Sequence, residues 1–417
     1  MASISIKSIF NEFWYIIFVE LSVIYSEIHW DSITENVEKM LNCRKPSGGY
    51  AEYICPRCFE KKKVAFTCKC RFCTSCGKRY IEEWVEKTVN NIFDVPHRHI
   101  IFTIPQELRN ILFMDRSLIK VMMDCAAKTA LEVLQRKKSD AVPGILAIVH
   151  TFGGDLKFNP HVHMLITEGG LTSDKQWDDI PFLPYSLLRK KWQYYLLTEL
   201  KAKLPKNREN SRLIDYLFKS KNNGFYVNAE KKMTSARYAA RYIGRYMARP
   251  ALAEYRIVRY EGNTVTFWYK DHKTNRNVTM TLEVKEFIKR LIDHIPLKGF
   301  KMVRRYGMYS RRSKSISIKV LQKCKRFIQM SIEFVKDLKP MSWRERLIRS
   351  FGKDPLICPK CGGEMLLWYI WHPEYGTIFE LSRDGPFEKI IEKVHKNQES
   401  KIVKDPYKHI QVGLFPI

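Results

Sequence analysis

The sequence predicts an α+β protein, with a central antiparallel sheet flanked by helices and small modules beside it. Two apolar runs, GILAIVHT at 144–151 and HVHMLIT at 161–167, are separated by a Gly-Gly-Asp turn, as in an antiparallel hairpin. Segments with apolar residues at helical spacing lie on both sides of these runs. The cysteines gather in two short segments with few apolar neighbours, so we expect modules held by something other than a hydrophobic core.

Helices and strands follow from the spacing of apolar residues and from the Gly and Pro residues between them. His99–Ile104 is a buried type of strand that ends at Pro105, and Gly262-Asn263 joins two later strands in a tight turn. We expect helices over residues 9–42, 80–91, 106–137 (as one helix or two), 186–202, 231–249, 283–293 and 315–338. We expect strands over residues 99–104, 144–151, 161–167, 255–260, 264–269 and 278–282.

The charge balance favours a nucleic-acid partner. The chain has 72 Lys and Arg residues against 44 Asp and Glu, a net charge of +28, and a globular protein with such an excess commonly meets a polyanion. Hydrophobic residues make up 45% of the chain, which excludes a disordered protein. The apolar stretch 9–25 contains Glu12 and Glu20, so we expect neither a membrane span nor a signal peptide. Closely spaced cysteine pairs indicate a reducing, cytoplasmic compartment.

The cysteine-rich segment has the spacing of a structural zinc site. Cys55-Pro-Arg-Cys58 and Cys73-Thr-Ser-Cys76 are 14 residues apart, and two such turns supply four sulfurs to a tetrahedral ion. Three further cysteines could replace one ligand, help to bind a second ion, or be ordinary buried thiols; they are Cys43, Cys68 and Cys70. The later pair Cys358 and Cys361 is half of such a site, with His372 and Cys324 as candidate partners or no metal at all.

Two histidines stand at the start of an apolar strand. His161 and His163 are two residues apart, so both imidazoles project from one face of the strand and could bind one metal ion. The plain alternative is a pair of partly buried histidines. His97-Arg98-His99 has the same spacing, but a charged residue between the histidines fits a core-backed strand poorly.

The hairpin also suggests a third ligand. If its turn centres near Asp155, His150 lies across from His161 and faces the same side. A slip of one residue would turn His150 away, and His99, Asp155 and Glu168 remain alternatives.

The segment 231–249 is a basic helix with regularly spaced tyrosines. It carries six basic residues and no acidic one, and Tyr242 and Tyr246 lie one turn apart on one face. An adjacent stripe is formed by Arg241, Arg245 and Arg249. One interpretation is a helix whose tyrosines are buried and whose arginines are exposed to solvent. The other is a pair of phenolic nucleophiles beside guanidinium groups that bind phosphates.

A second basic segment spans residues 298–314. It interleaves Phe300, Tyr306 and Tyr309 with basic residues and contains no acidic one. Aromatic rings can stack on unpaired bases while basic side chains follow the phosphates. We therefore expect it to hold single-stranded DNA, the alternative being a solvated surface loop. Its leading basic residues are Lys298, Lys301, Arg304 and Arg305.

Together these features resemble the two-tyrosine HUH transposases of bacterial rolling-circle insertion sequences, over roughly residues 35–310. The resemblance is specific in the cysteine-rich stretch 43–76, in the segment from His150 to His163, and in Tyr242-Ile-Gly-Arg-Tyr246 with Arg249-Pro250. It implies an HUH endonuclease domain acting as a metal-dependent endonuclease and strand transferase through 5′-phosphotyrosine intermediates. Its substrates would be single-stranded DNA at transposon ends and target DNA.

The resemblance also assigns roles to residues. His161 and His163 would hold the catalytic ion, which is Mg²⁺ or Mn²⁺ if the third ligand is an oxygen. Tyr242 and Tyr246 would be the nucleophiles, although Tyr238 is in phase with them. The protein would act in the bacterial cytoplasm, at the nucleoid.

Two rival functions remain. A replication initiator or relaxase would use the same chemistry on a different DNA, and a zinc-ribbon protein would bind nucleic acid without cutting it. The expected segments are 1–42 (helical), 43–92 (zinc-binding), 93–250 (HUH nuclease with the tyrosine helix), 251–345 (basic DNA-binding extension of hairpins and helices) and 346–417 (C-terminal segment with the Cys358/Cys361 knuckle).

Overall fold

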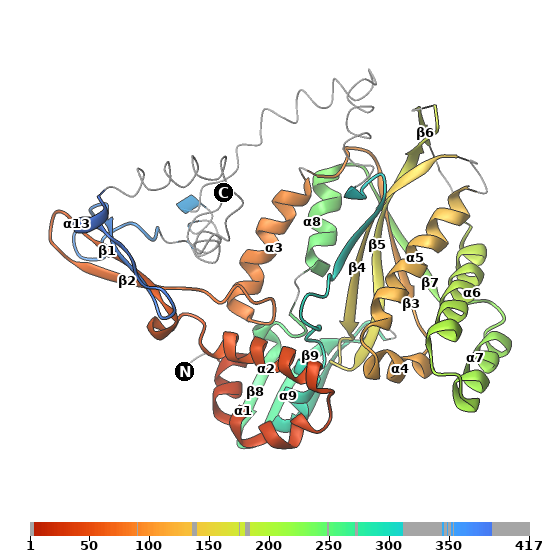
Figure 1. Cartoon of the computed structure of the whole chain (residues 1–417), viewed down its shortest axis with the longest axis horizontal. Helices are drawn as coiled ribbons and strands as arrows, with labels where there is room; N and C mark the ends of the chain where they lie inside the picture. The colour runs from red at the N-terminus through yellow and green to blue at the C-terminus, as the bar shows by residue number, and fades with distance from the viewer. Residues whose placement is uncertain are drawn as a thin grey trace. The chain divides into compact units, whose positions relative to one another are not determined.

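The computed structural model describes two compact units (Figure 1). The first unit comprises residues 1–34 and 80–338, and the second comprises residues 35–79 and 339–417. Described within them are residues 4–89, 91–135, 140–174, 176–179, 184–247, 250–271, 274–311, 344–345, 348, 352 and 354–385. The second unit combines the cysteine-rich segment with the C-terminal strands, because β-strands of these two segments pair with each other.

A six-stranded antiparallel sheet is the centre of the first unit, which confirms the predicted α+β class with antiparallel sheets. The order is β11-β4-β5-β3-β7, and β6 pairs with β5. The strands are β3 (His97–Thr103), β4 (Val142–Phe152), β5 (Phe158–Leu171), β6 (Trp177–Asp179), β7 (Val227–Met233) and β11 (Val303–Gly307). The predicted hairpin is the β4–β5 pair, in which His150 lies opposite His161.

One face of this sheet buries the main core. Alternate residues of β4 and β5, such as Ile145, Ala147 and Met164, point to this face and pack against helices. Figure 1 shows α5, α6 and α7 on this side. The helices here are α4 (Arg109–Met114), α5 (Leu118–Gln135), α6 (Tyr185–Lys203) and α7 (Arg208–Ser220). Helix α7 was not predicted from the sequence. It begins after Asn207, whose side chain accepts a hydrogen bond from the Asn210 amide as an N-cap.

The opposite face packs against α8 (Ala236–Met247), with α3 (Thr74–Val89) beyond it. Gly244 is buried in α8, and a Cβ added there would lie 2.3 Å from Val85 Cγ2, so only glycine allows this approach of the two helices. The predicted helix start at residue 231 is wrong. Residues 231–233 belong to β7, because pairing with β3 at the sheet edge overrides their helical spacing.

The N-terminal segment forms two helices rather than the one predicted over 9–42. These are α1 (Ile6–Ser22) and α2 (Glu27–Leu41), and Trp14 stacks on Trp30 across the turn between them, with ring centroids 5.6 Å apart. Helix α1 contacts α9 (Val284–Ile292). A separate antiparallel sheet has the order β10-β9-β8, from β8 (Ile257–Glu261), β9 (Thr264–Lys270) and β10 (Asn277–Glu283).

Residues 312–343, which include most of the helix predicted over 315–338, lie outside the described part of the chain. Short 3₁₀ turns occur at Pro46–Gly48, Gln106–Leu108 and Glu254–Arg256. Among the helices described, none is both long enough and apolar enough to cross a membrane.

The second unit contains a four-stranded antiparallel sheet of order β13-β12-β1-β2. Its strands are β1 (Tyr50–Ile54), β2 (Lys61–Ala65), β12 (Leu366–His372) and β13 (Gly376–Glu380), and α13 (Leu381–Asp384) follows. The core of this unit is a small cluster of buried residues. It consists of Ala51, Tyr53, Met365, Ile370 and Phe379 together with the cysteines Cys55 and Cys358.

Candidate functional site: a histidine face beside the tyrosine helix

Three histidines converge on the face of the central sheet that packs against α8. Each has a ring nitrogen within 4.8 Å of a ring nitrogen of the others: His150 of β4 and His161 and His163 of β5. His150 and His163 are buried and His161 is partly exposed. The register predicted for His150 is therefore the observed one, because the β4–β5 pairing places it directly opposite His161.

Hydrogen bonds fix the nitrogens that face the centre of this group. His161 Nδ1 lies 2.7 Å from the Asn159 carbonyl oxygen, so it carries the proton and donates to that oxygen. This leaves His161 Nε2 as a lone-pair donor. His163 Nδ1 lies 2.9 Å from His99 Nε2. Burial and the neighbouring imidazoles hold the pKa of His163 well below its usual value, so its ring stays neutral, as a metal ligand must be.

The donor set fits a divalent metal ion, and the group includes His150, the third ligand suggested by the hairpin. Mg²⁺ prefers oxygen ligands, and Mg²⁺ or Mn²⁺ was expected if the third ligand were an oxygen. The structure offers the nitrogen of His150 in that place. Three imidazoles suit a first-row ion such as Mn²⁺ better than Mg²⁺.

The other candidate ligands have different contacts. Glu168 accepts from the Arg98 guanidinium, with Oε1 2.6 Å from Nη2, and the Asp155 carboxylate accepts from the Lys157 amide in the hairpin turn. Arg98 thus lies within β3 despite its charge, contrary to the expectation that it would disfavour a strand there.

His97 is held by two hydrogen bonds away from the group of three histidines. Its Nδ1 lies 2.6 Å from the Val95 carbonyl oxygen and its Nε2 lies 2.7 Å from the Tyr309 hydroxyl, so this buried histidine has a structural role.

Tyr242 lies beside the histidine face. Its ring packs edge-on against His99, with centroids 5.2 Å apart, and the next tyrosine along the helix, Tyr238, is 6.3 Å from it and about half exposed. Tyr246 follows one turn later, near the end of α8. Arg241 is exposed on the same helix. The side chains of Tyr246 and Arg245, and all of Arg249, lie outside the described part.

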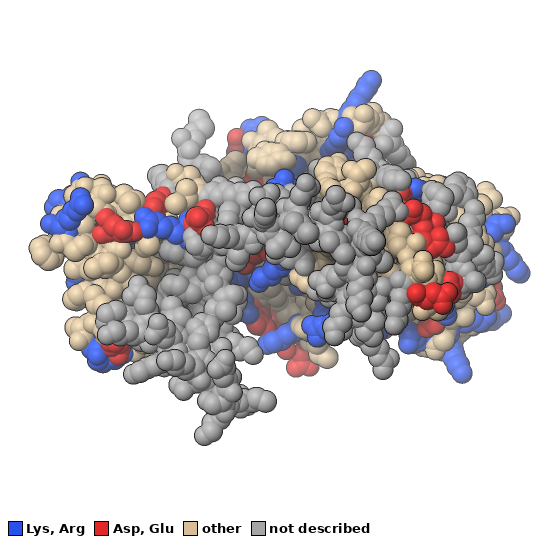
Figure 2. All heavy atoms as spheres, turned by 90° about the horizontal axis from the view of Figure 1, so that it is seen from above, with Lys and Arg blue, Asp and Glu red and all other residues tan. Residues whose placement is uncertain are grey.

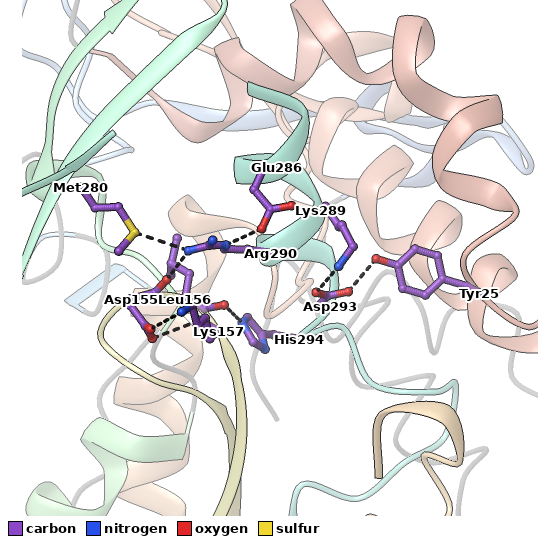
Figure 3. Close-up of polar contacts among 10 residues, drawn as sticks. All are labelled: Tyr25, Asp155, Leu156, Lys157, Met280, Glu286, Lys289, Arg290, Asp293 and His294. Atoms are coloured by element: carbon purple, nitrogen blue, oxygen red, sulfur yellow. Dashed lines mark hydrogen bonds and ion pairs between the residues drawn. The ribbon is translucent and has the colours of Figure 1, made fainter. Parts of the chain in front are cut away.

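The turn that joins β4 to β5 is clamped by the end of α9 (Figure 3). His294 Nε2 is 2.9 Å from the Leu156 carbonyl oxygen, and its Nδ1 is 3.1 Å from Thr151 Oγ1. Arg290 donates to the Asp155 carbonyl oxygen at 3.1 Å. Burial lowers the pKa of His294 to about 4, so this clamp does not depend on a charged ring. Residue spacing in the sequence does not reveal this role of His294 and Arg290, because it depends on packing between distant segments.

A buried carboxylate extends this clamp toward the N-terminal helices. Asp293 accepts from the Tyr25 hydroxyl at 2.6 Å and from Lys289 Nζ at 3.2 Å (Figure 3). Burial, followed by the nearby Asp293 charge, raises the pKa of Tyr25, which therefore remains a hydroxyl donor. The α1–α2 turn, α9 and the β4–β5 turn are thus held in one network.

Within residues 298–311, the described part of the basic segment, the structure is neither the surface loop nor the base-stacking strip that was expected. Residues 303–307 form β11, which pairs with β4. Tyr309 is buried, and the Tyr306 hydroxyl donates to Asp124 at 2.7 Å, so neither ring is presented to a base. The two arginines of the strand point to opposite faces.

Arg304 lies on the α5 side, where its Nε is 3.5 Å from Asp124 Oδ1. Arg305 is exposed and shares the α8 side with Val303, which packs into the apolar cluster under α8. Lys298 and Lys301 are exposed in the segment before the strand. Of Arg304 and Arg305, only Arg305 therefore lies on the sheet face that carries the histidines.

Surface charge does not by itself mark a DNA path. On the face drawn in Figure 2, Lys and Arg side chains of the described residues occur in several groups, with acidic side chains among them. The position of Arg305 relative to the histidines is therefore a more specific guide than the net charge.

Eight of the cysteines in the described part of the chain form two clusters, and the single predicted site of Cys55, Cys58, Cys73 and Cys76 is wrong as a grouping. Cys324, a candidate partner of Cys358 and Cys361, lies outside the described residues. In the first cluster, Cys73 and Cys76 of the α3 start meet Cys43 and Cys68; Cys76 Sγ is 3.6 Å from both of these sulfurs. In the second cluster, Cys55 and Cys58 meet Cys358 and Cys361. The pairs that are close in sequence lie in different clusters because β1 pairs with β12.

Backbone hydrogen bonds favour the thiolate form of Cys55 and Cys358 in the second cluster. Burial acts against ionisation of Cys55, but amide donors from Cys58 and Arg57 lower its pKa to about 7. The amides of Cys361 and Lys360 likewise lower the pKa of Cys358. Thiolates are the form that binds zinc. Cys70 lies outside both clusters, with its Sγ 2.9 Å from Asn36 Oδ1, and is an ordinary buried thiol.

Two segments of the chain match families of known proteins. Residues 20–104 match the family described as "Transposase zinc-binding domain", and residues 144–316 match the family described as "Putative transposase". The second match spans both the histidine face and α8. In these two segments the chain is similar to zinc-binding transposases.

Two relatives of the chain are similar over most of their length. The "Transposase for insertion sequence element IS801" of Pseudomonas savastanoi pv. phaseolicola is 28% identical over 354 residues, which cover 81% of this chain and 83% of the relative. The "Putative transposase y4qJ" of Sinorhizobium fredii is 26% identical over 345 residues, 78% of this chain and 86% of the relative. No solved structure matches the chain.

The contact between His99 and His163 leads to a testable prediction. If His163 binds a metal through Nε2, its Nδ1–H donates to His99 and orients the ring. We expect His99→Leu to weaken Mn²⁺ binding about 10- to 100-fold, as measured by calorimetry. His99→Gln, whose amide oxygen can accept the same bond, should restore most of the affinity.

His97→Leu is the matched control. His97 lies on the same strand as His99, but it bonds to Tyr309 and not to the group of three histidines. Its Mn²⁺ affinity should stay near that of the unmodified protein. Equal losses for the His97 and His99 variants would show that the effect comes from general disruption of β3.

Proposed function

We propose that the first unit is an HUH nuclease domain that cuts and rejoins single-stranded DNA at transposon ends and in target DNA. The transposase family supports DNA as the substrate. The observation that carries the proposal is the contact of Tyr242 with His99, which itself contacts His163 in the group of three histidines. The ring of a tyrosine thus packs against a histidine that contacts the candidate metal site, and this supports cleavage by a tyrosine nucleophile.

His150, His161 and His163 would hold the divalent ion, which when bound supplies positive charge to the scissile phosphate. Tyr242 would be the nucleophile that attacks phosphorus. The bond from its oxygen to phosphorus forms as the bond from phosphorus to the 3′ oxygen breaks, and the 3′ oxygen takes up a proton while the phenol loses one. The product is a 5′-phosphotyrosine and a free 3′-hydroxyl. Because the ester keeps the bond energy, the reverse reaction joins strands without ATP.

A second tyrosine would allow a second cut while the first remains linked to DNA. We assign this role to Tyr246, one turn along α8 from Tyr242. Tyr238 is the alternative, since it lies one turn away in the other direction and its ring contacts Tyr242. Arg241, Arg245 and Arg249 follow the tyrosines along this segment and would bind phosphates of the strand.

Arg305 extends the proposed DNA path, because it is exposed on the sheet face that carries the histidines. Lys298 and Lys301 precede it on an exposed segment and would contact the phosphates next along the strand. Arg304 is left out, since it faces α5 and contacts Asp124. We further propose that Cys43, Cys68, Cys73 and Cys76 hold the structural zinc of the zinc-binding domain.

Removing a single phenolic oxygen tests the nucleophiles. Tyr242→Phe or Tyr246→Phe keeps the ring but should lower transposition about a thousandfold or more, with folding and DNA binding near normal. Transposition is measured from a donor plasmid in cells, and folding by thermal denaturation. Tyr238→Phe should stay active. Full activity of the Tyr242 and Tyr246 double mutant would refute the assignment.

The two arginines of β11 provide a matched pair for DNA binding. Arg305→Ala should weaken binding to single-stranded DNA of any sequence and reduce the slope of log affinity against log salt by about 1. Arg304→Ala should leave this slope unchanged, because Arg304 contacts Asp124 and Tyr306 on the far face of the sheet. Fluorescence anisotropy over a salt series measures both. A larger change for Arg304→Ala would place the DNA on the α5 side.

A further inference from the structure

We propose that Cys55, Cys58, Cys358 and Cys361 bind a second structural zinc ion, so that one chain holds two. The match to the zinc-binding family ends at residue 104 and does not reach Cys358 and Cys361. These two pairs are 300 or more residues apart in sequence. The inference does not depend on the DNA chemistry proposed above.

The positions of the four sulfurs match those of a tetrahedral zinc site. Cys55 Sγ lies 3.4 Å from Cys361 Sγ, and Cys58 Sγ lies 3.6 Å from Cys358 Sγ. A ligand atom of each residue is within 4.8 Å of the others. Zinc with four sulfurs at about 2.3 Å requires sulfur–sulfur separations of about 3.8 Å. The observed separations are close to this value and well beyond the length of a disulfide bond, about 2.05 Å.

The backbone around the two pairs is nearly identical. The Cys55 amide donates to Glu60 and the Phe59 amide donates back to Cys55; the Cys358 amide donates to Gly363 and the Gly362 amide donates back to Cys358. In each case the residue after the second cysteine has a positive φ, 56° at Phe59 and 70° at Gly362. Phe rarely adopts this conformation. Two distant segments therefore form the same tight turn, each presenting two sulfurs.

The sheet of the second unit brings these turns together. Cys55 directly follows β1, and the second turn comes shortly before β12. The pairing of Ile54 with Leu366 places the end of β1 beside the start of β12. Both turns therefore lie at the same end of the sheet. The Lys62 ammonium group also donates to the Pro355 carbonyl oxygen at 3.1 Å, which adds a contact between the two segments.

The apolar core of the second unit is small, so a metal ion bound here would have a structural role. Its described core cluster has five buried apolar residues besides Cys55 and Cys358. So small a core supplies little stability by itself, and metal binding can provide folding free energy in modules of this kind. A zinc ion here would fix the C-terminal strands to the zinc-binding domain.

The test is zinc counting on the full-length protein purified without chelator. Elemental analysis should give two zinc ions per chain for the unmodified protein. The variant with Cys358→Ser and Cys361→Ser should hold one, and so should the variant with Cys73→Ser and Cys76→Ser. Cys125→Ser is the control and should hold two, because Cys125 belongs to α5 and to neither cluster.

If a double variant is insoluble, single changes at the exposed Cys361 keep the test decisive. Cys361→His retains four zinc ligands and should hold two ions, whereas Cys361→Ser should lose the second ion to a chelator faster than the unmodified protein. One zinc ion in the unmodified protein would overturn the proposal. Two ions that remain in the Cys358/Cys361 double variant, or disulfides between these pairs in non-reducing mass spectrometry, would overturn it as well.

Discussion

The register of β4 against β5 is the constraint on which the histidine site depends. Side chains alternate between the two faces of a strand, so a shift of one residue would move His150 into the helical core and separate it from His161. The short turn between these strands sets this register. Leu156 in that turn is fully buried and has a φ of 64°, a conformation that costs a leucine roughly 1–3 kcal/mol.

The end of α9 holds this strained turn in place. His294 and Arg290 bind two successive carbonyl oxygens of the turn, and His294 also contacts Thr151 of β4. Asp293 connects the same helix to Tyr25. The residues that would bind metal are therefore positioned by side chains from two distant segments. Helix α8 then covers the same face and places Tyr242 against His99.

The sequence predicted what local spacing determines. The hairpin, the shared face of His161 and His163, and the place of His150 followed from the two-residue period of strands and from the Gly-Gly-Asp turn. Two failures concern pairing between distant segments. Spacing alone combined Cys55/Cys58 with Cys73/Cys76, whereas the β1–β12 pairing brings Cys358/Cys361 to Cys55/Cys58. Likewise, β11 is a strand of the central sheet because its backbone pairs with β4.

The most direct test of the central claim is to map the covalent bond between the unmodified protein and DNA. The protein would be incubated with a single-stranded transposon end and Mn²⁺, digested with protease, and analysed by mass spectrometry for a peptide linked to nucleotide. We predict that the linked residue is Tyr242 or Tyr246 of α8, and that the linked peptide disappears when His161 is replaced by Ala. A link only to Tyr238 or to a tyrosine outside α8, or no link under conditions in which the DNA is cut, would contradict the account.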